Sequence, residues 1–155
     1  MVPTEALFKL CEQHNLDVIY EDLGSNLRGL YIKHPRLQQP LIALHVMLRT
    51  DERLLRCVLA EEIGHHLTGV GNYMLCYNRQ RTWMDKAEYM AMKWAANFLV
   101  PPDQLMTTLR RYSIEELADF FYVTEGFIRW QIDRLRSSLS PEKVEGFYYS
   151  TLGGW

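Results

Sequence analysis

The sequence predicts an α+β fold: a helical domain that carries a small three-stranded sheet and ends in a further helical part. Three observations lead to this prediction. Apolar residues recur at helical spacing in residues 4–15, and short aliphatic and aromatic runs replace that spacing in residues 17–46. The helical spacing then returns and continues to residue 139. We expect one domain over residues 1–155.

Within that domain, residues 1–100 are expected to form the core, residues 101–139 a helical part and residues 140–155 a tail. Apolar residues make up 48% of the chain and charged residues 23%, which excludes an intrinsically disordered protein. The net charge of −2 argues against a protein built chiefly to bind phosphate backbones. No signal-peptide pattern and no apolar run of membrane-spanning length is found.

The three cysteines, Cys11, Cys57 and Cys76, are odd in number and widely spaced. This pattern predicts neither a disulfide framework nor a CxxC metal pair. Reduced thiols in a cytoplasmic protein are the simplest interpretation.

The first predicted elements follow from the change from helical spacing of apolar residues to short apolar runs. Leu7, Leu10 and Cys11 lie at helical spacing within residues 4–15. Three short strands are then predicted, and they are expected to pair antiparallel. Turn residues separate them, and they span residues 17–22, 28–33 and 41–46.

Two long helices follow. Thr50 is a plausible N-cap for a helix over residues 50–68, and Gly69 would end it. The second helix is predicted over residues 82–100, where Pro101 stops it.

The C-terminal helical part resembles the first helices of a helix-turn-helix. Ser113 and Glu116 form a capping box, and Thr124 is placed to cap a helix over residues 125–139. Residues 103–139 hold five arginines against six acidic residues, a net charge of −1. A DNA-binding module has a basic face, so we expect internal packing or partner binding here.

The most informative segment reads LAEEIGHHLT, from Leu59 to Thr68. Residues four apart on a helix point the same way, so Glu61 and His65 share one face with apolar neighbours. The opposite face is also apolar, which predicts a largely buried helix. Buried carboxylates need partners, and a metal ion held by Glu61 and His65 would supply one. The alternative is a solvated face with an i,i+4 pair and no metal.

The spacing also selects a register. In the HExxH helix, two residues four apart hold the metal, and the Glu after the first of them accepts a proton. If Glu61 and His65 are the ligands, Glu62 occupies that position and can act as the base. If Glu62 and His66 were the ligands, the position would belong to Ile63, which cannot accept a proton. We therefore predict Glu61 and His65 as ligands and Glu62 as general base.

A third ligand is predicted on the next helix. Glu88 interrupts an apolar stripe whose alanines, Ala91 and Ala95, permit another helix to approach closely. In zincins a third ligand comes from a later helix packed on the first. Asp85, one turn earlier, is the competing ligand, although its position suits the helix N-terminus better.

Two segments together resemble a known family. The sequence VLAEEIGHHLTG (residues 58–69), followed by AEYMAMKWAANFLVP (residues 87–101), resembles the ImmA/IrrE family of zinc metallopeptidases. The resemblance extends over roughly residues 4–139 and includes the order of a helix, three strands and the active-site helix. It implies a zincin-like fold.

Mapped onto this chain, the resemblance implies His65 and Glu88 as zinc ligands, Glu62 as general base and Glu61 at the first-ligand position. Many members have His there, and a branch associated with phages and mobile elements has Glu. Two carboxylates and one imidazole are a harder donor set, so zinc is the expected metal with manganese or iron as alternatives.

Family members cleave repressors of phages or mobile elements, or regulators of stress responses. The resemblance therefore implies a cytoplasmic, metal-dependent endopeptidase whose protein substrate is a repressor of the helix-turn-helix type, with no membrane or nucleic-acid partner. The alternative function is a catalytically weak or inactive module of the same fold that binds a regulator protein.

Further residues are weaker candidates. The strand over residues 41–45 could hold a substrate backbone by β-augmentation, and His45 at its end is more plausibly a structural histidine. Tyr73 and Tyr77 could donate to an oxyanion, but packing is the simpler role. Cys57 could contact a metal, although a buried cysteine is usually apolar filling.

Overall fold

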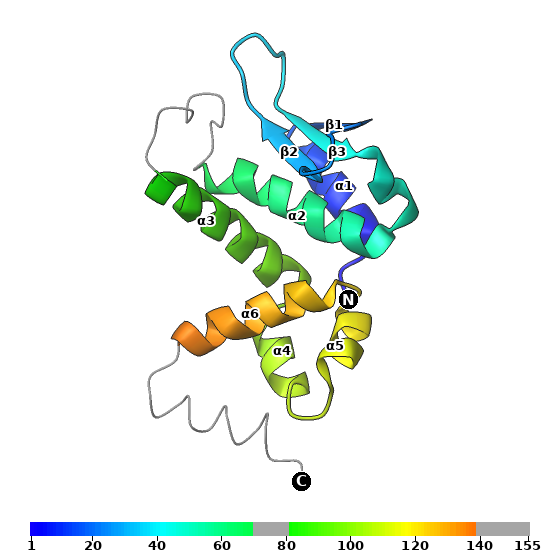
Figure 1. The fold of residues 1–155 in the computed structure, drawn as a ribbon, viewed down its shortest axis with the longest axis vertical. Helices are drawn as coiled ribbons and strands as arrows, with labels where there is room; N and C mark the ends of the chain where they lie inside the picture. Colours follow the sequence, from blue (N-terminus) through cyan, green and yellow to red (C-terminus); the bar gives the residue numbers. More distant parts are fainter. Residues whose placement is uncertain (70–80, 139–155) are drawn as a thin grey trace. The chain divides into compact units, whose positions relative to one another are not determined.

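A computed structural model describes residues 1–69 and 81–138, with side chains in the second range from Lys86 onward. The chain divides into two units, Val2–Ala95 and Ala96–Trp155 together with Met1. Each unit is described by itself. Figure 1 labels the elements, and the division falls within α3 (Arg81–Leu99).

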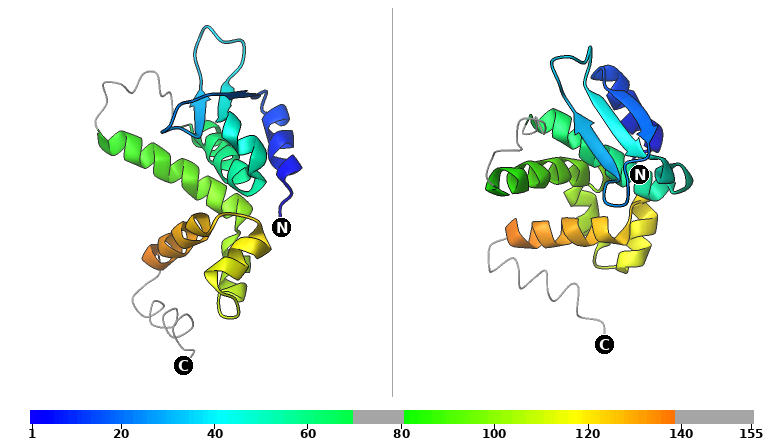
Figure 2. Two further views of the ribbon diagram at one scale, coloured as in Figure 1. Left: turned by 45° about the vertical axis from the view of Figure 1, so that its right-hand side comes forward. Right: turned by 45° about the horizontal axis from the view of Figure 1, so that its top comes forward.

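The first unit combines helices with the predicted three strands, which confirms the α+β class. Helix α2 contacts α1 and the strands β2 and β3, and two views in Figure 2 show the sheet lying over it. The elements are α1 (Thr4–Gln13), β1 (Asp17–Glu21), β2 (Gly29–Ile32), β3 (Leu41–His45), the 3-10 helix η1 (Val46–Thr50), α2 (Glu52–Thr68) and the first part of α3.

The strand order is β1-β3-β2, so β3 is the central strand. β2 pairs with β3 antiparallel, with Tyr31 opposite Ile42. β1 pairs with β3 in parallel, with Ile19 opposite Ala43. The antiparallel expectation is therefore right for one pair and wrong for the other. The chain turns after β1 as predicted, but the following strand joins the far side of β3 instead of pairing with β1.

Two features of this unit bear on its environment. Cys11 and Cys57 are buried and form no disulfide among the described residues, while Cys76 lies outside them. Among the helices that the structure describes, none combines the length and the hydrophobicity that a membrane crossing requires.

The second unit contains α4 (Pro102–Thr108), α5 (Ile114–Phe121) and α6 (Glu125–Ser138). The predicted capping box is present: the amide of Glu116 donates to the Ser113 hydroxyl, and the Ser113 amide donates to the Glu116 carboxylate. The Phe127 amide donates to the hydroxyl of Thr124, which caps α6 as predicted. α5 and α6 pack against each other, and the expected likeness to a helix-turn-helix stays a prediction. The predicted tail lies outside the described residues.

Candidate metal centre

Helix α2 carries the candidate site, and its ends follow from local chemistry. Gly69 adopts a left-handed conformation (φ 66°) and ends the helix as predicted. The N-cap is Asp51, whose carboxylate accepts from the Leu54 amide. The expectation for Thr50 is wrong, because Thr50 ends the preceding η1 turn and its hydroxyl donates to the Met47 carbonyl.

Two adjacent faces of α2 carry polar side chains. The candidate ligands Glu61 and His65 are four residues apart, and Glu88 of α3 reaches this face. Glu62 contacts β2 at Gly29. His66, which follows Glu62 by four residues, contacts β2 through the side chain of Tyr31. We call these the α3 face and the β2 face of α2. The helix is buried along most of its length, as predicted.

A close approach of α2 and α3 forms the α3 face. A Cβ atom added at Gly64 would lie 2.4 Å from the backbone oxygen of Ala91, so only glycine permits this contact. Ala91 and Ala95 are fully buried. Glu88 lies one turn before Ala91 on α3, and the close contact therefore brings its carboxylate towards α2.

Three side chains meet there. Each of Glu61, His65 and Glu88 offers one ligand atom, and these atoms all lie within 4.8 Å of one another. Nε2 of His65 is 3.5 Å from Oε2 of Glu88. Donors that share one ion stand on the order of 3–4 Å apart, so this group is close to a coordinating arrangement. One imidazole and two carboxylates are also donor types that a divalent ion accepts.

The electrostatics of the group favour a cation. Burial and the neighbouring Glu88 carboxylate raise the pKa of Glu61 above its usual range, and His65 opposes this shift. Burial alone would lower the pKa of His65, but its hydrogen bond to Glu88 and the charges of Glu62, Glu88 and Glu61 raise it instead. Burial and mutual repulsion disfavour the charged form of these carboxylates, and a bound positive ion would stabilise it.

Glu62 lies beside this group but faces β2. Burial raises the pKa of Glu62 to about 7, while His65 and the nearby backbone of Tyr31 limit the rise. The side chain is 8% exposed. A Cβ at Gly29 would lie 2.6 Å from Oε1 of Glu62, so the absence of a side chain at Gly29 makes room for the carboxylate. A carboxylate with a pKa near 7 can accept and return a proton at neutral pH.

His66 does not belong to the group that could hold a metal. Its Nδ1 lies 2.9 Å from the hydroxyl of Tyr31, and the ring packs edge-on against that of His14. Burial, His14 and Lys33 lower the pKa of His66. The four-residue repeat thus separates Glu61 and His65 from Glu62 and His66, as the predicted register requires.

The other candidates fall into two groups. Cys57 is buried on α2 but is absent from the metal-capable group found among the described residues. The side chain of Asp85 and the residues Tyr73 and Tyr77 lie outside the described part of the chain. The competing ligand and the oxyanion donors therefore stay predictions.

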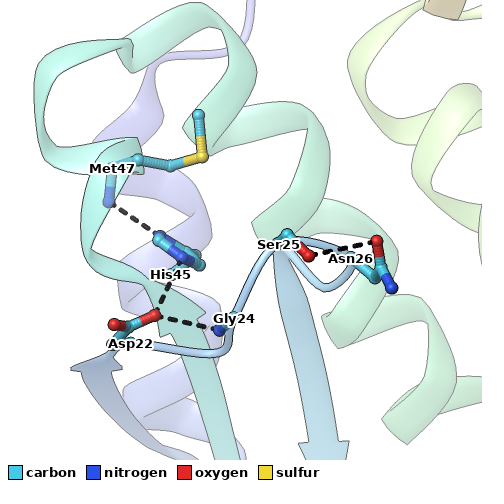
Figure 3. Close-up of polar contacts among 6 residues, drawn as sticks. All are labelled: Asp22, Gly24, Ser25, Asn26, His45 and Met47. Atoms are coloured by element: carbon cyan, nitrogen blue, oxygen red, sulfur yellow. Dashed lines mark hydrogen bonds and ion pairs between the residues drawn. The ribbon is translucent and has the colours of Figure 1, made fainter.

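The suggestion that residues 41–45 hold a substrate strand is wrong, because β3 is paired on both sides. Figure 3 shows His45 in a structural role. Its Nδ1 accepts from the Met47 amide, and its Nε2 lies 3.4 Å from Oδ1 of Asp22, so it links the ends of β3 and β1.

Sequence reasoning did not identify Gly29 and Tyr31 as neighbours of Glu62. Both lie about thirty positions before Glu62, and no short-range spacing relates them to the helix. A glycine that opens a strand was the one available signal, because it often marks a close approach.

Comparison with known proteins gives one match. The family model of the IrrE N-terminal-like domain (Peptidase_M78) matches residues 11–132. The searches of curated proteins and of solved structures found no significant match. The matched residues include every member of the metal-capable group and Glu62.

Proposed function

The chain belongs to the IrrE N-terminal-like domain family (Peptidase_M78), and from that premise we propose that it is a metal-dependent endopeptidase. The observation that carries the proposal is the convergence of Glu61, His65 and Glu88 from two helices, with the buried carboxylate of Glu62 beside them. The substrate we propose is a repressor-like regulator of a phage or mobile element, a class that rests on the family resemblance.

Glu61, His65 and Glu88 would hold the metal, and zinc is the ion we propose. Manganese and iron are the alternatives, since two of the three donors are carboxylates. When bound, the ion would act as a Lewis acid that polarises the scissile carbonyl.

Glu62 is the proposed general base. Its buried carboxylate would take a proton from the attacking water. The same group would then return the proton to the nitrogen of the leaving amine. The raised pKa suits both steps, because the carboxyl group must exchange its proton near neutral pH.

The substrate backbone is proposed to lie along β2. β2 is an edge strand and contacts the helix that carries the site. An extended peptide can add to such an edge through main-chain hydrogen bonds. This strand replaces β3 in the expectation drawn from the sequence.

We place this activity in the cytoplasm. The regulators that such a peptidase would cleave act there, and the buried thiols of Cys11 and Cys57, which form no disulfide among the described residues, are compatible with a reducing compartment.

The decisive experiment replaces the base without changing its shape. Glu62→Gln is co-expressed with a candidate repressor-like protein, and the length of that protein is followed on a gel. We expect cleavage to fall by about 10²- to 10⁴-fold, with the metal content unchanged. Glu115→Gln, the same change at an exposed position of α5, is the matched control and should cleave normally.

Two outcomes would contradict the peptidase proposal. Stable association without cleavage by the wild-type chain would favour the alternative, a module that binds the regulator. Undiminished cleavage by Glu62→Gln would remove Glu62 from the mechanism.

A further inference from the structure

The sheet of the first unit has two faces, and α2 packs against one of them. The side chain of Tyr31 contacts His66 of α2, and Gly29 makes room for Glu62 of the same helix. Figure 2 shows α1 and α2 on the same side of the sheet. Successive residues of a strand point to opposite faces, so Leu30 and the residues in phase with it point away from α2.

The strand register defines the residues of this second face, which we call the open face. They form three rows, and each row crosses β1, β3 and β2 in that order. The rows are Asp17–Leu41–Ile32, Ile19–Ala43–Leu30 and Glu21–His45–Arg28. Five apolar side chains therefore lie next to one another across all three strands.

The apolar side chains of the open face are partly accessible. Ile19 is 38% exposed, and Leu30, Ile32 and Leu41 are half-buried. A sheet face that only meets water usually carries polar side chains at these alternate positions. Adjacent accessible apolar side chains with a charged rim are typical of a protein–protein contact. The open face is therefore a candidate interaction surface.

The third row carries opposite charges at its two ends. Glu21 on β1 and Arg28 beside β2 are both exposed. The strand β3 lies between them, so they stand about 10 Å apart, which is two strand spacings. Neither forms an ion pair with another described residue. The face is thus acidic at one edge and basic at the other.

This charge pattern is complementary to itself under a two-fold rotation. An axis parallel to the strands and above β3 would place each row opposite the same row of a second copy, with β1 facing β2. Glu21 of each copy would then meet Arg28 of the other, and Ile19 would meet Leu30. Ala43 would meet its own equivalent at the centre, where its small side chain permits the usual sheet spacing of about 10 Å.

We propose that the open face binds the open face of a second copy of this chain and forms a two-fold symmetric dimer. The contact uses side chains and not the backbone of β2, so the strand edge proposed for the substrate stays available. Glu61, His65 and Glu62 lie on α2, on the other side of the sheet. The inference is independent of the proposed peptidase activity.

Sedimentation equilibrium of the full-length chain tests the dimer without a substrate or a metal. A patch smaller than the standard interface of about 1,600 Å² should give a Kd on the order of 10–100 µM. As the concentration is raised through that range, the average mass should rise from 18.3 kDa towards twice this value. In ¹⁵N NMR spectra, the amide shifts of Ile19, Leu30 and Ala43 should depend on concentration.

A charge in the middle row tests where the copies meet. Ile19→Asp should raise the Kd by at least about tenfold, because the new carboxylate would be buried in the contact. Met106→Asp is the control: Met106 on α4 is 39% exposed and lies outside the open face. This variant should dimerise like the wild type, and circular dichroism checks that both variants fold.

Exchanging the edge charges tests the symmetry. Glu21→Arg or Arg28→Glu alone sets like charges against each other on both sides of the axis, so the Kd should rise by about five- to tenfold at low salt. The double variant restores opposite charges and should return the Kd to within about twofold of the wild-type value. Within one copy the two residues are separated by β3, so an effect on the folded monomer would give no such recovery.

Three results would overturn the proposal. The first is the mass of a single chain at every concentration, and the second is a dimer that Ile19→Asp leaves intact. The third is a double variant that dimerises no better than the single ones. All three concern self-association alone, so they are distinct from a failure of the proposed peptidase function.

Discussion

The α3 face and the β2 face of α2 are built by different means. On the α3 face, a glycine and buried alanines let two helices approach, and ionisable side chains fill the remaining space. On the β2 face, the missing side chain of Gly29 makes room for the single buried carboxylate of Glu62. The first arrangement suits a cation, which needs several donors. The second suits a base, because burial raises the pKa of its carboxyl group to about 7.

The largest contrast is expected from the two adjacent histidines. His65→Ala should weaken metal binding by more than about 100-fold, because it removes a ligand. His66→Ala should retain the metal, since His66 faces Tyr31. Elemental analysis after dialysis and titration with Zn²⁺ measure both effects, and equal loss in the two variants would refute the register.

The third ligand is tested in the same way. Glu88→Ala should lower metal affinity sharply, because the Glu88 carboxylate is one of the three converging groups. Asp85→Ala should not. The reverse result would move the third ligand to Asp85. If both variants keep the metal, the two-helix site is contradicted.

A glycine substitution separates the α3 face from general stability. In Gly64→Ala, the new methyl group would meet the Ala91 carbonyl, so α3 must shift and Glu88 with it. We expect metal affinity to fall, together with about 1–3 kcal/mol of unfolding free energy. Gly69→Ala is the control: nothing lies within 4 Å of its Cβ, so only the strain of its left-handed backbone is added. Urea unfolding and metal titration of both variants decide the comparison.

The corresponding change on the β2 face should affect cleavage alone. In Gly29→Ala, the methyl group would overlap Oε1 of Glu62 and Cγ1 of Val58. We expect cleavage to fall by about tenfold or more while the metal is retained, since the ligands lie on the other face. Loss of metal in this variant would show that the two faces are not independent.

The smallest expected effect concerns a residue outside both faces of α2, and it serves as a reference for the other variants. Burial raises the pKa of Cys11 in α1 from 9.0 to about 11. The folded state therefore favours the thiol, and this contribution is complete below pH 9 and is lost as the pH rises towards 11. Unfolding free energy measured across that window should decline less steeply in Cys11→Ala than in the wild type. Identical slopes would contradict the shift.

Sequence reasoning succeeded where short-range geometry decides the outcome. Glu61 and His65 are related by one helical turn, and the alanines that accompany Glu88 indicated the close contact with α2. It failed where distant segments meet. The parallel pairing of β1 with β3 depends on which edge the second strand joins, and no local pattern records that choice.

The error at Thr50 has a related cause. Threonine and aspartate both cap helices, and the choice between them depended on the η1 turn that precedes α2. The close approach of Gly29 to Glu62 depends in turn on the strand register, which only the assembled sheet defines.

The position of β2 at the sheet edge has a consequence for partial unfolding. β2 has four residues and, within the described part of the chain, pairs with β3 alone, whereas α2 and α3 are long helices. Edge segments of this kind open with less free energy than the core around them. Mild heat or denaturant should therefore detach β2 from Glu62 first. The proposed metal ion would then stay bound over a range of conditions in which the proposed cleavage is already lost.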